Sequence, residues 1–458
     1  MNRIHFIAVG GAAMHNLAIA LSKEDDTVVT GSDDEIFEPS LSRLKKNGLL
    51  PDKMGWFPDE RIDSGLEAVI VGMHATEDNP ELIRAKELGL EIYSFPEYLY
   101  ERCKNKTRVV IGGSHGKTTT TAMILYVLNK LNYHPDYMVG AQIEGFEDMV
   151  KLSGDSVIAV FEGDEYLTSP IDRRPKFHLY KPHIAVVTGI AWDHINVFPT
   201  FDIYVEQFRK FAGLIEPDGR FIYFDGDENL KTIAGNLRPD VVAFPYNTPK
   251  HIIHNGVTCL QTGKGKETAL SIFGEHNLQN MEAARLVCRQ IGVNDNRFYD
   301  AIKDFTGASN RLQKIAETES SVAFKDFAHS PSKLRATVKA VRSQYPDRNV
   351  IACMELHTFS SLTKDFLPQY AGCMSEADTA FVYYNPEVIR HKRLEDIDPV
   401  QVKEAFGGNN LTVFTDTELL QEKLKSLDYK NSALLMMSSG NFSGIDIEEF
   451  AGELIKSV

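Results

Sequence analysis

The chain has 458 residues and a formal net charge of −15; 43% of its residues are hydrophobic and 25% are charged. This length exceeds one ordinary core, so two to four globular domains are expected. The acidic balance argues against a surface that coats nucleic acid. No apolar run approaches the roughly 20 residues that span a bilayer, and no signal-peptide pattern precedes the first strand. We therefore expect a cytoplasmic protein without a membrane span or a nucleic-acid partner.

The first hundred residues alternate between strand patterns and helix patterns. The apolar run Ile4–Val9 is followed by a helical pattern over Met14–Leu21, and further strand patterns follow at Thr27–Thr30, Ala68–Val71 and Glu91–Tyr93. Alternation of this kind predicts a parallel α/β domain of Rossmann type.

A glycine turn follows the first strand pattern and resembles a dinucleotide fingerprint. The turn contains Gly10 and Gly11. Ala8 stands at the position of the first glycine of the fingerprint, and Ala13 stands at the position of a neighbouring small residue. Asp33, about 20 residues beyond the turn, stands where a Rossmann carboxylate meets a ribose hydroxyl. By itself, this region would also suit a nicotinamide-dependent oxidoreductase.

The most informative segment is Gly112–Thr120, which lies between the strand pattern Val109–Ile111 and an amphipathic helical pattern. The N–H groups of such a turn surround phosphate oxygens at a helix N-terminus. Lys117, expected to face solvent, would neutralise the β- and γ-phosphates, and the Thr118 hydroxyl would hold Mg²⁺. The segment thus predicts an ATP site. The alternative is a glycine turn without a ligand, since Ile111 stands where the general P-loop pattern has its first glycine.

Two polar segments follow the next strand patterns. Glu162 comes just after Val157–Phe161, and His194 follows Ile184–Thr188. Ligands of open α/β sheets gather beyond the carboxyl ends of the strands, so Glu162 can complete a Mg²⁺ site with Thr118. His194 can bind a second Mg²⁺ or the reacting carboxylate. The alternatives are a solvated acidic loop, which also holds Asp164 and Glu165, and a structural histidine.

The rest of the chain predicts a further α/β unit. Residues 232–275 carry short alternating segments, and a helix opens at Gly274–Asn277. Further strand patterns stand at Val322–Phe324, Val350–Met354, Thr379–Tyr383 and Ala433–Met437. We therefore predict an α/β protein of three domains: a Rossmann-like domain over 1–106, a P-loop ATPase-like domain over 107–310, and a Rossmann-like domain over 311–458.

The motifs, in their order, resemble the Mur ligase family, which builds the peptide stems of the bacterial cell wall. They are GSHGKTTT (113–120), EGDEY (162–166), DHINVF (193–198), GEHNLQN (274–280), NRLQK (310–314) and DFAHSP (326–331). The resemblance extends over the whole chain. It implies an ATP- and Mg²⁺-dependent ligase that activates the lactyl carboxylate of UDP-N-acetylmuramate as an acyl phosphate, which an amine then attacks.

The resemblance also assigns residues to the ligands. For catalysis it implies Lys117, Glu162, His194 and Arg311, and for the metal Thr118, Glu162 and His194. For ATP it implies Gly113, Ser114, His115, Gly116, Lys117, Thr118, Thr119, Asn277, Asn280, Arg311, Asp326 and His329. For the UDP-sugar it implies Gly10, Gly11, Ala12, Ala13, Met14, Ser32, Asp33, His74 and His194. Asn277 could instead cap a helix, and Asp326 could be a structural carboxylate.

The amine acceptor is the least determined element of this interpretation. Residues 163–182 resemble the branch of the family that attaches the peptide L-Ala-γ-D-Glu-meso-diaminopimelate in peptidoglycan recycling, and Asp172, Arg173, Arg174 and Lys176 put charges in that segment. A peptide acceptor is therefore expected, with free L-alanine, used in peptidoglycan biosynthesis, as the alternative. The segment could also be a solvated surface loop. Residues 355–364 resemble an amino-acid loop of the family but contain no arginine.

Two other classes of protein are weaker explanations. An oxidoreductase would leave Lys117 and Thr118 without a role, and a non-enzymatic nucleotide switch would need no UDP-sugar. We expect a monomer.

Overall fold

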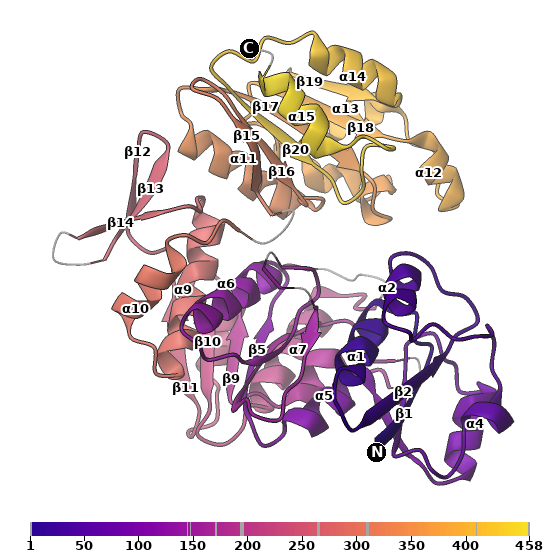
Figure 1. Ribbon diagram of the computed structural model, residues 1–458. Coiled ribbons are helices and arrows are strands. Elements are labelled where there is room, and N and C mark those ends of the chain that lie inside the picture. The colour runs from indigo at the N-terminus through magenta and orange to yellow at the C-terminus, as the bar shows by residue number, and fades with distance from the viewer. Residues whose placement is uncertain are drawn as a thin grey trace. The chain divides into compact units, whose positions relative to one another are not determined.

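The structure is a computed structural model that describes residues 2–143, 145–146, 148–169, 172–192, 197–262, 266–307, 311–408 and 410–456. The described chain is α/β with mostly parallel sheets (Figure 1), which confirms the predicted fold class. It divides into two units, Met1–Asn247 with Gln279–Ala301 and Thr248–Leu278 with Ile302–Val458. The domain boundaries at 106/107 and 310/311 remain predictions. No helix within the described residues is long and apolar enough to cross a membrane.

The first unit begins with a four-stranded parallel sheet in the order β2-β1-β3-β4, at the indigo end of the chain in Figure 1. The strands are β1 (Asn2–Ile7), β2 (Thr27–Ser32), β3 (Ala68–Val71) and β4 (Glu91–Ser94). The helices are α1 (Ala12–Ser22), α2 (Ser40–Lys46), α3 (Pro58–Arg61), α4 (Pro80–Glu87) and α5 (Phe95–Cys103). All four residues of β3 are buried, as expected for a parallel strand that is covered on both faces.

A seven-stranded sheet completes the first unit, in the order β11-β10-β9-β5-β8-β6-β7. Its strands are β5 (Thr107–Gly112), β6 (Asp136–Met138), β7 (Val150–Lys151), β8 (Ile158–Glu162), β9 (Ile184–Val187), β10 (Arg220–Phe224) and β11 (Val242–Tyr246). Its helices are α6 (Lys117–Lys130), η1 (Lys176–Tyr180), α7 (Phe201–Gly213), α8 (Glu228–Ala234), α9 (Glu275–Gln290) and α10 (Asp295–Ile302). The strand β5 pairs in parallel with β8 on one side and with β9 on the other, so the loops that follow all three emerge at one edge.

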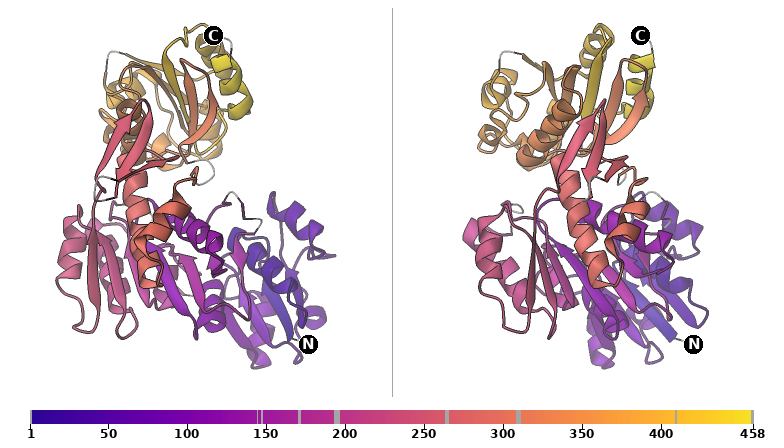
Figure 2. Two further views of the ribbon diagram at one scale, coloured as in Figure 1. Left: turned by 60° about the vertical axis from the view of Figure 1, so that its left-hand side comes forward. Right: turned by 90° about the vertical axis from the view of Figure 1, so that its left-hand side faces the viewer.

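The second unit carries a six-stranded sheet in the order β15-β16-β20-β17-β18-β19 and a small antiparallel sheet β12-β13-β14, which can be followed in Figure 2. The strands are β12 (His251–His254), β13 (Val257–Gln261), β14 (Glu267–Leu270), β15 (Gln313–Glu317), β16 (Val322–Asp326), β17 (Asn349–Leu356), β18 (Thr379–Tyr384), β19 (Leu411–Phe414) and β20 (Ser432–Met437). The helices are α11 (Pro331–Gln344), η2 (Ser360–Leu362), η3 (Leu367–Tyr370), α12 (Pro386–His391), α13 (Pro399–Phe406), α14 (Thr417–Lys425) and α15 (Ile447–Lys456).

Strand positions agree with the sequence prediction better than strand ends do. β3 spans the predicted residues, whereas β1 ends at Ile7 and leaves Ala8 in the glycine turn with a φ of 64°. The fingerprint has glycine at this position because a left-handed backbone is strained for a residue with a Cβ. The strands β6, β7, β15 and β19 were missed; each has five residues or fewer. Such short segments carry little periodicity by which a strand could be recognised.

The charged segment after β8 is anchored in the core. Phe177 of η1 is fully buried and stacks on Phe211, with ring centroids 4.5 Å apart. A Cβ on Gly112, at the end of β5, would lie only 3.2 Å from the Phe177 ring. The segment therefore supports the strand that leads into the predicted ATP site, whatever its surface charges do.

We expect Phe177→Ala to lower the free energy of unfolding of the first unit by about 3–5 kcal/mol, because it leaves a cavity behind β5. Both tryptophans, Trp56 and Trp192, lie in this unit, so denaturant titration followed by tryptophan fluorescence measures it selectively. The control is Val157→Ala at a position 74% exposed, which should change stability by less than about 0.5 kcal/mol. Equal losses in the two variants would contradict the anchoring role.

Candidate active site

The predicted phosphate-binding turn links β5 to α6. Gly113 has a φ of 122°, and a Cβ there would lie 2.3 Å from Thr188 Oγ1. Gly116 has a φ of 81°, and a Cβ there would lie 2.3 Å from Asn280 Oδ1. Both positions therefore need glycine for two reasons, the backbone conformation and the close approach of a neighbour. The N-terminus of α6 opens directly from this turn, as a phosphate site requires.

Lys117, the first residue of α6, is not the solvent-facing lysine expected from the sequence. Its side chain is 16% exposed, and its Nζ donates to the Gly113 carbonyl oxygen at 2.7 Å. It also donates to both carboxylate oxygens of Glu165, at 2.9 and 2.7 Å. Burial lowers the pKa of Lys117, but the carboxylates of Glu165 and Asp164 outweigh burial and raise it. Lys117 is therefore a stable cation at the phosphate turn.

Thr118 and Glu162 lie together, as predicted for metal ligands. Thr118 Oγ1 donates to Glu162 Oε1 at 2.9 Å, and Gly140 N donates to Glu162 Oε2 at 2.9 Å. Glu162 is the last residue of β8, opposite Ile111 of β5. A hydroxyl and a carboxylate suit Mg²⁺, which prefers oxygen ligands and keeps several waters. No cluster of three histidine, cysteine or acidic side chains that could hold a metal is found among the described residues.

The loop after β9 completes the same edge of the sheet. Ser114 N donates to the Gly189 carbonyl oxygen at 2.9 Å, and Ala191 N donates to Ser114 Oγ at 2.9 Å. These bonds tie the phosphate turn to the segment that carries His194. His194 itself lies outside the described residues, so its predicted metal and substrate roles remain predictions.

Further residues predicted to bind ATP lie in the turn, on α6 and on α9. His115 is half-buried and Thr119 is buried on α6, and Asn280 of α9 lies against Gly116. Asn277 is the third residue of α9 and donates its amide to the Phe273 carbonyl oxygen at 3.0 Å, so it is not the helix N-cap considered as an alternative.

The predicted UDP-sugar residues gather at the carboxyl edge of the N-terminal sheet. Gly10 N donates to Asp33 Oδ2 at 2.7 Å. Burial raises the pKa of Asp33 despite this bond. His74 is exposed in the turn after β3, whereas Ser32 is fully buried in contact with Glu81 and with His5 at 3.2 Å. Ala12, Ala13 and Met14 form the first turn of α1.

Arg311, Asp326 and His329 meet in the second unit. Asp326, at the end of β16, accepts from Leu312 N at 2.5 Å and from Thr337 Oγ1 at 3.3 Å. Arg311 lies 4.8 Å over the Phe327 ring, and His329 Nδ1 contacts the Phe327 carbonyl oxygen at 2.9 Å. Burial raises the pKa of Asp326, while Arg311 and the Leu312 N–H oppose that shift.

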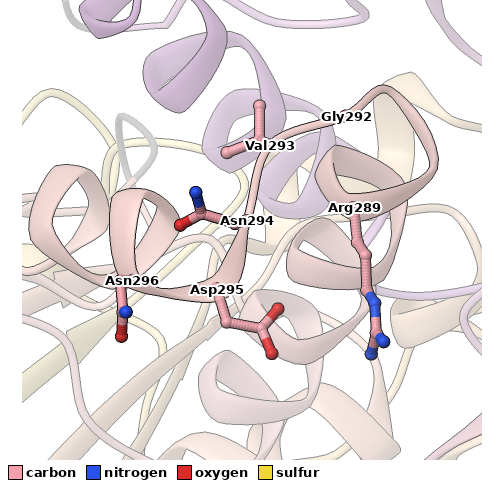
Figure 3. Close-up of a pocket in the computed structure, with 6 residues that line it drawn as sticks. All are labelled: Arg289, Gly292, Val293, Asn294, Asp295 and Asn296. Carbon is pink, nitrogen blue, oxygen red and sulfur yellow. The ribbon is translucent and has the colours of Figure 1, made fainter.

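A cavity of about 440 Å³ lies elsewhere, between the end of α9 and the start of α10 (Figure 3). Its lining residues are Arg289, Gly292, Val293, Asn294, Asp295 and Asn296. None of them belongs to the predicted ATP or substrate residues.

Sequence reasoning missed two residues at the phosphate turn, Glu165 and Tyr204. A solvated loop was the alternative considered for Glu165, but its side chain is fully buried, and Tyr204 of α7 donates to its Oε1 at 3.0 Å. The signal available for Glu165 was its place three residues after Glu162, in the loop directly beyond β8. No local pattern distinguishes Tyr204 from the other aromatic residues of an amphipathic helix.

Comparisons with known proteins agree with this architecture. Residues 111–288 match the family model of the Mur ligase middle domain, and residues 310–440 match that of the Mur ligase, glutamate ligase domain. A UDP-N-acetylmuramate–L-alanine ligase of Caldicellulosiruptor bescii is 32% identical over 399 residues, which are 83% of each chain. The chain therefore belongs to the Mur ligase family of ATP-dependent ligases.

Two solved structures extend the comparison. The UDP-N-acetylmuramate–alanine ligase of Thermotoga maritima has a TM-score of 0.69 over all of both chains at 20% identity, which shows the shared fold. The UDP-N-acetylmuramate:L-alanyl-gamma-D-glutamyl-meso-diaminopimelate ligase of Neisseria meningitides has a TM-score of 0.57 at 25% identity, over 67% of this chain and 98% of its own.

We expect Gly116→Ala to weaken ATP binding by about 100-fold, because the left-handed backbone and the Asn280 contact both oppose a Cβ where the turn must surround phosphate. Isothermal titration with ATP measures the effect. Gly213→Ala at the end of α7 is the matched control, since nothing lies within 4 Å of its Cβ. ATP affinity within about twofold of the parent in Gly116→Ala would contradict the assignment of this turn.

We expect Glu162→Gln to raise the Mg²⁺ concentration for half-maximal activity by about tenfold or more, because an amide is a poorer ligand for a hard cation. The control is Glu228→Gln on the surface of α8. Activity is titrated with Mg²⁺ at saturating ATP. Superimposable titrations for Glu162→Gln and the parent would remove Glu162 from the metal site.

For Asp326→Asn we expect opposite effects on stability and activity. The raised pKa of Asp326 means that the folded protein disfavours its charged form. Protonation of Asp326 therefore stabilises the folded parent at low pH, and this stabilisation is lost as the pH rises through the folded-state pKa. The Asp326→Asn variant should therefore unfold at a higher temperature than the parent at pH 7, and the difference between the two unfolding temperatures should shrink as the pH falls. Turnover should fall by on the order of tenfold or more if the carboxylate serves the nucleotide. Calorimetry from pH 4 to pH 8 measures the unfolding temperature, and steady-state assays measure turnover. Unchanged turnover in Asp326→Asn would leave Asp326 a structural carboxylate.

Proposed function

We propose that the chain joins the lactyl carboxylate of UDP-N-acetylmuramate to the amino group of an L-alanyl acceptor, at the expense of ATP. The observation that carries this proposal is the arrangement at the edge of β5 and β8, where the Lys117 cation and the Thr118–Glu162 pair adjoin a glycine turn at a helix N-terminus. Both kinds of relative named above act on UDP-N-acetylmuramate.

The chemistry of amide formation needs the groups found at this edge. A carboxylate does not react with an amine until one oxygen becomes a leaving group, and phosphorylation by ATP provides that group. The amine then attacks the acyl phosphate, and phosphate departs. Both steps move negative charge between oxygens, so positioned cations matter more than a covalent nucleophile. Lys117 would neutralise the phosphates, and Thr118 and Glu162 would hold Mg²⁺, which neutralises further phosphate charge.

We assign the UDP-sugar to the N-terminal glycine turn. The support is the cluster of Gly10, Asp33 and His74 beyond the carboxyl ends of three adjacent strands, β1, β2 and β3. Ligands of open parallel sheets bind at this edge. Ser32 is buried beneath it, so we assign it a supporting place rather than direct contact. We keep the cytoplasm as the proposed location and the monomer as the proposed state.

The relatives favour free L-alanine as the acceptor. Three relatives that are 30–32% identical to this chain carry the name UDP-N-acetylmuramate–L-alanine ligase. This supports the alternative drawn from the sequence more than the peptide acceptor that we expected first.

A specific observation keeps the peptide acceptor as the second candidate. Arg173 and Arg174 are exposed on the loop before η1, where a peptide with several carboxylates would find partners that alanine does not need. Arg174 already pairs with Asp172 at 2.6 Å and with Glu97 at 3.2 Å, and Lys176 pairs with Asp164 at 2.6 Å. Among the residues that the structure describes, no ion pair is found for Arg173, in contrast to Arg174 and Lys176.

We expect product formation with ATP, Mg²⁺, UDP-N-acetylmuramate and L-alanine. The assay measures kcat/KM for L-alanine and for L-Ala-γ-D-Glu-meso-diaminopimelate in parallel, with mass spectrometry of the products. If alanine is the acceptor, Arg173→Ala leaves its kcat/KM within about twofold, as expected of an exposed side chain. A higher value for the peptide, reduced about tenfold by Arg173→Ala, would give the assignment to the peptide acceptor. Absence of both products would reject the proposed function.

A further inference from the structure

The buried partner of Lys117 has a consequence for nucleotide binding. An ammonium group has three N–H donors. The Lys117 ammonium makes three contacts, one with the Gly113 carbonyl oxygen and two with Glu165, and all are between 2.7 and 2.9 Å. The cation that a triphosphate needs is thus already engaged by a carboxylate.

Glu165 is itself held firmly in this position. Its side chain is fully buried, and Oε1 accepts from Tyr204 OH at 3.0 Å as well as from Lys117. Tyr204 OH lies 3.0 Å from Ser114 Oγ, which accepts from Ala191 N at 2.9 Å. The carboxylate is therefore connected to the phosphate turn twice, once through Lys117 and once through Tyr204 and Ser114.

Carboxylate and phosphate oxygens are both anionic acceptors, and they compete for the same N–H donors. A lysine carries its charge at one point, so it cannot present a second full set of donors to a phosphate while Glu165 keeps two of its three contacts. Charge-assisted hydrogen bonds of this type are about twice as strong as neutral ones. Nucleotide binding at this turn must therefore exchange at least one of the three Lys117 contacts for a contact with phosphate, and two of the three are with Glu165.

We propose that Glu165, fixed by Tyr204 and Ser114, is a positioning residue that holds the Lys117 ammonium in the nucleotide-free phosphate turn and competes with ATP for it. The inference rests on the ATP site of the proposed function and adds a residue to it. Glu165 keeps a buried cation paired when no phosphate is present, which avoids the large cost of an unpaired buried charge. The same pairing weakens ATP binding.

The decisive measurement is the dissociation constant of ATP for the full chain carrying Glu165→Gln, determined by isothermal titration at pH 7 with Mg²⁺. Glutamine keeps the size of the side chain and an acceptor for Tyr204 but removes the competing charge. We expect ATP to bind about tenfold more tightly than to the parent, which is the order of one charge-assisted hydrogen bond. The matched control is Glu228→Gln, the same change on the surface of α8. Glu228 is exposed and pairs with Lys231 at 2.8 Å, so ATP affinity should stay within about twofold.

A second readout separates positioning from a merely structural role. The competition needs the Lys117 ammonium, because Glu165 acts through its two contacts with Nζ. The gain in ATP affinity should therefore disappear when Glu165→Gln is introduced into a chain that already carries Lys117→Gln. A residue with a merely structural role would change ATP affinity by the same factor in both backgrounds.

If Glu165→Gln proves unfolded by its melting curve, Tyr204→Phe decides the question, because it keeps the ring and removes only the hydroxyl that fixes Glu165. We expect about two- to threefold tighter ATP binding in that variant. Unchanged or weaker ATP binding in the folded variants overturns the inference and leaves the proposed function intact. A parent chain that binds no ATP rejects the ATP site of the proposed function, and with it the inference.

Discussion

The parallel pairing of β5 with β8 and β9 is the constraint on which the candidate active site depends. Register brings the end of β5 opposite Glu162 on one side and Val187 on the other, so the loops after all three strands emerge together. The phosphate turn, the Thr118–Glu162 pair and the Ser114–Ala191 contact all follow from that alignment. Phe177, from the same segment as Arg173 and Arg174, packs against Gly112 at the end of β5 and supports that strand.

Buried charge is concentrated where ligands are proposed. Lys117 forms an ion pair with the fully buried Glu165, and Asp33 and Asp326 are carboxylates whose pKa burial raises. A charge that the fold must bury lowers stability unless it is paired, so carboxylates of this kind are candidates for function. Lys117 and Glu165 also show how such a charge can be kept in the absence of ligand, by a partner that the ligand later replaces.

The charged segment that suggested a peptide acceptor also has a structural role. The segment 163–182 was interpreted from its resemblance to a peptide-attaching branch and from its charges, but Phe177, Leu179 and Tyr180 are buried in the core of the first unit. Lys176 is paired with Asp164, and Arg174 with Asp172 and Glu97. The segment therefore has a structural reason that is independent of substrate, and the exposed Arg173 is the side chain by which a peptide would be distinguished from an amino acid.

The sequence by itself determined the α/β class, the family, and the strand–turn–helix from β5 to α6, because these depend on local periodicity and on short motifs. It also predicted that Thr118 and Glu162 would meet, since both follow neighbouring strands. Only the tertiary structure decided that Lys117 is paired and half-buried, that Ser32 is enclosed, and that Asn277 lies inside α9. The first two facts depend on Glu165, Tyr204, Glu81 and His5, which are distant in sequence from Lys117 and Ser32 and contact them through packing that no local pattern records. The third depends on where α9 begins, which a motif does not determine.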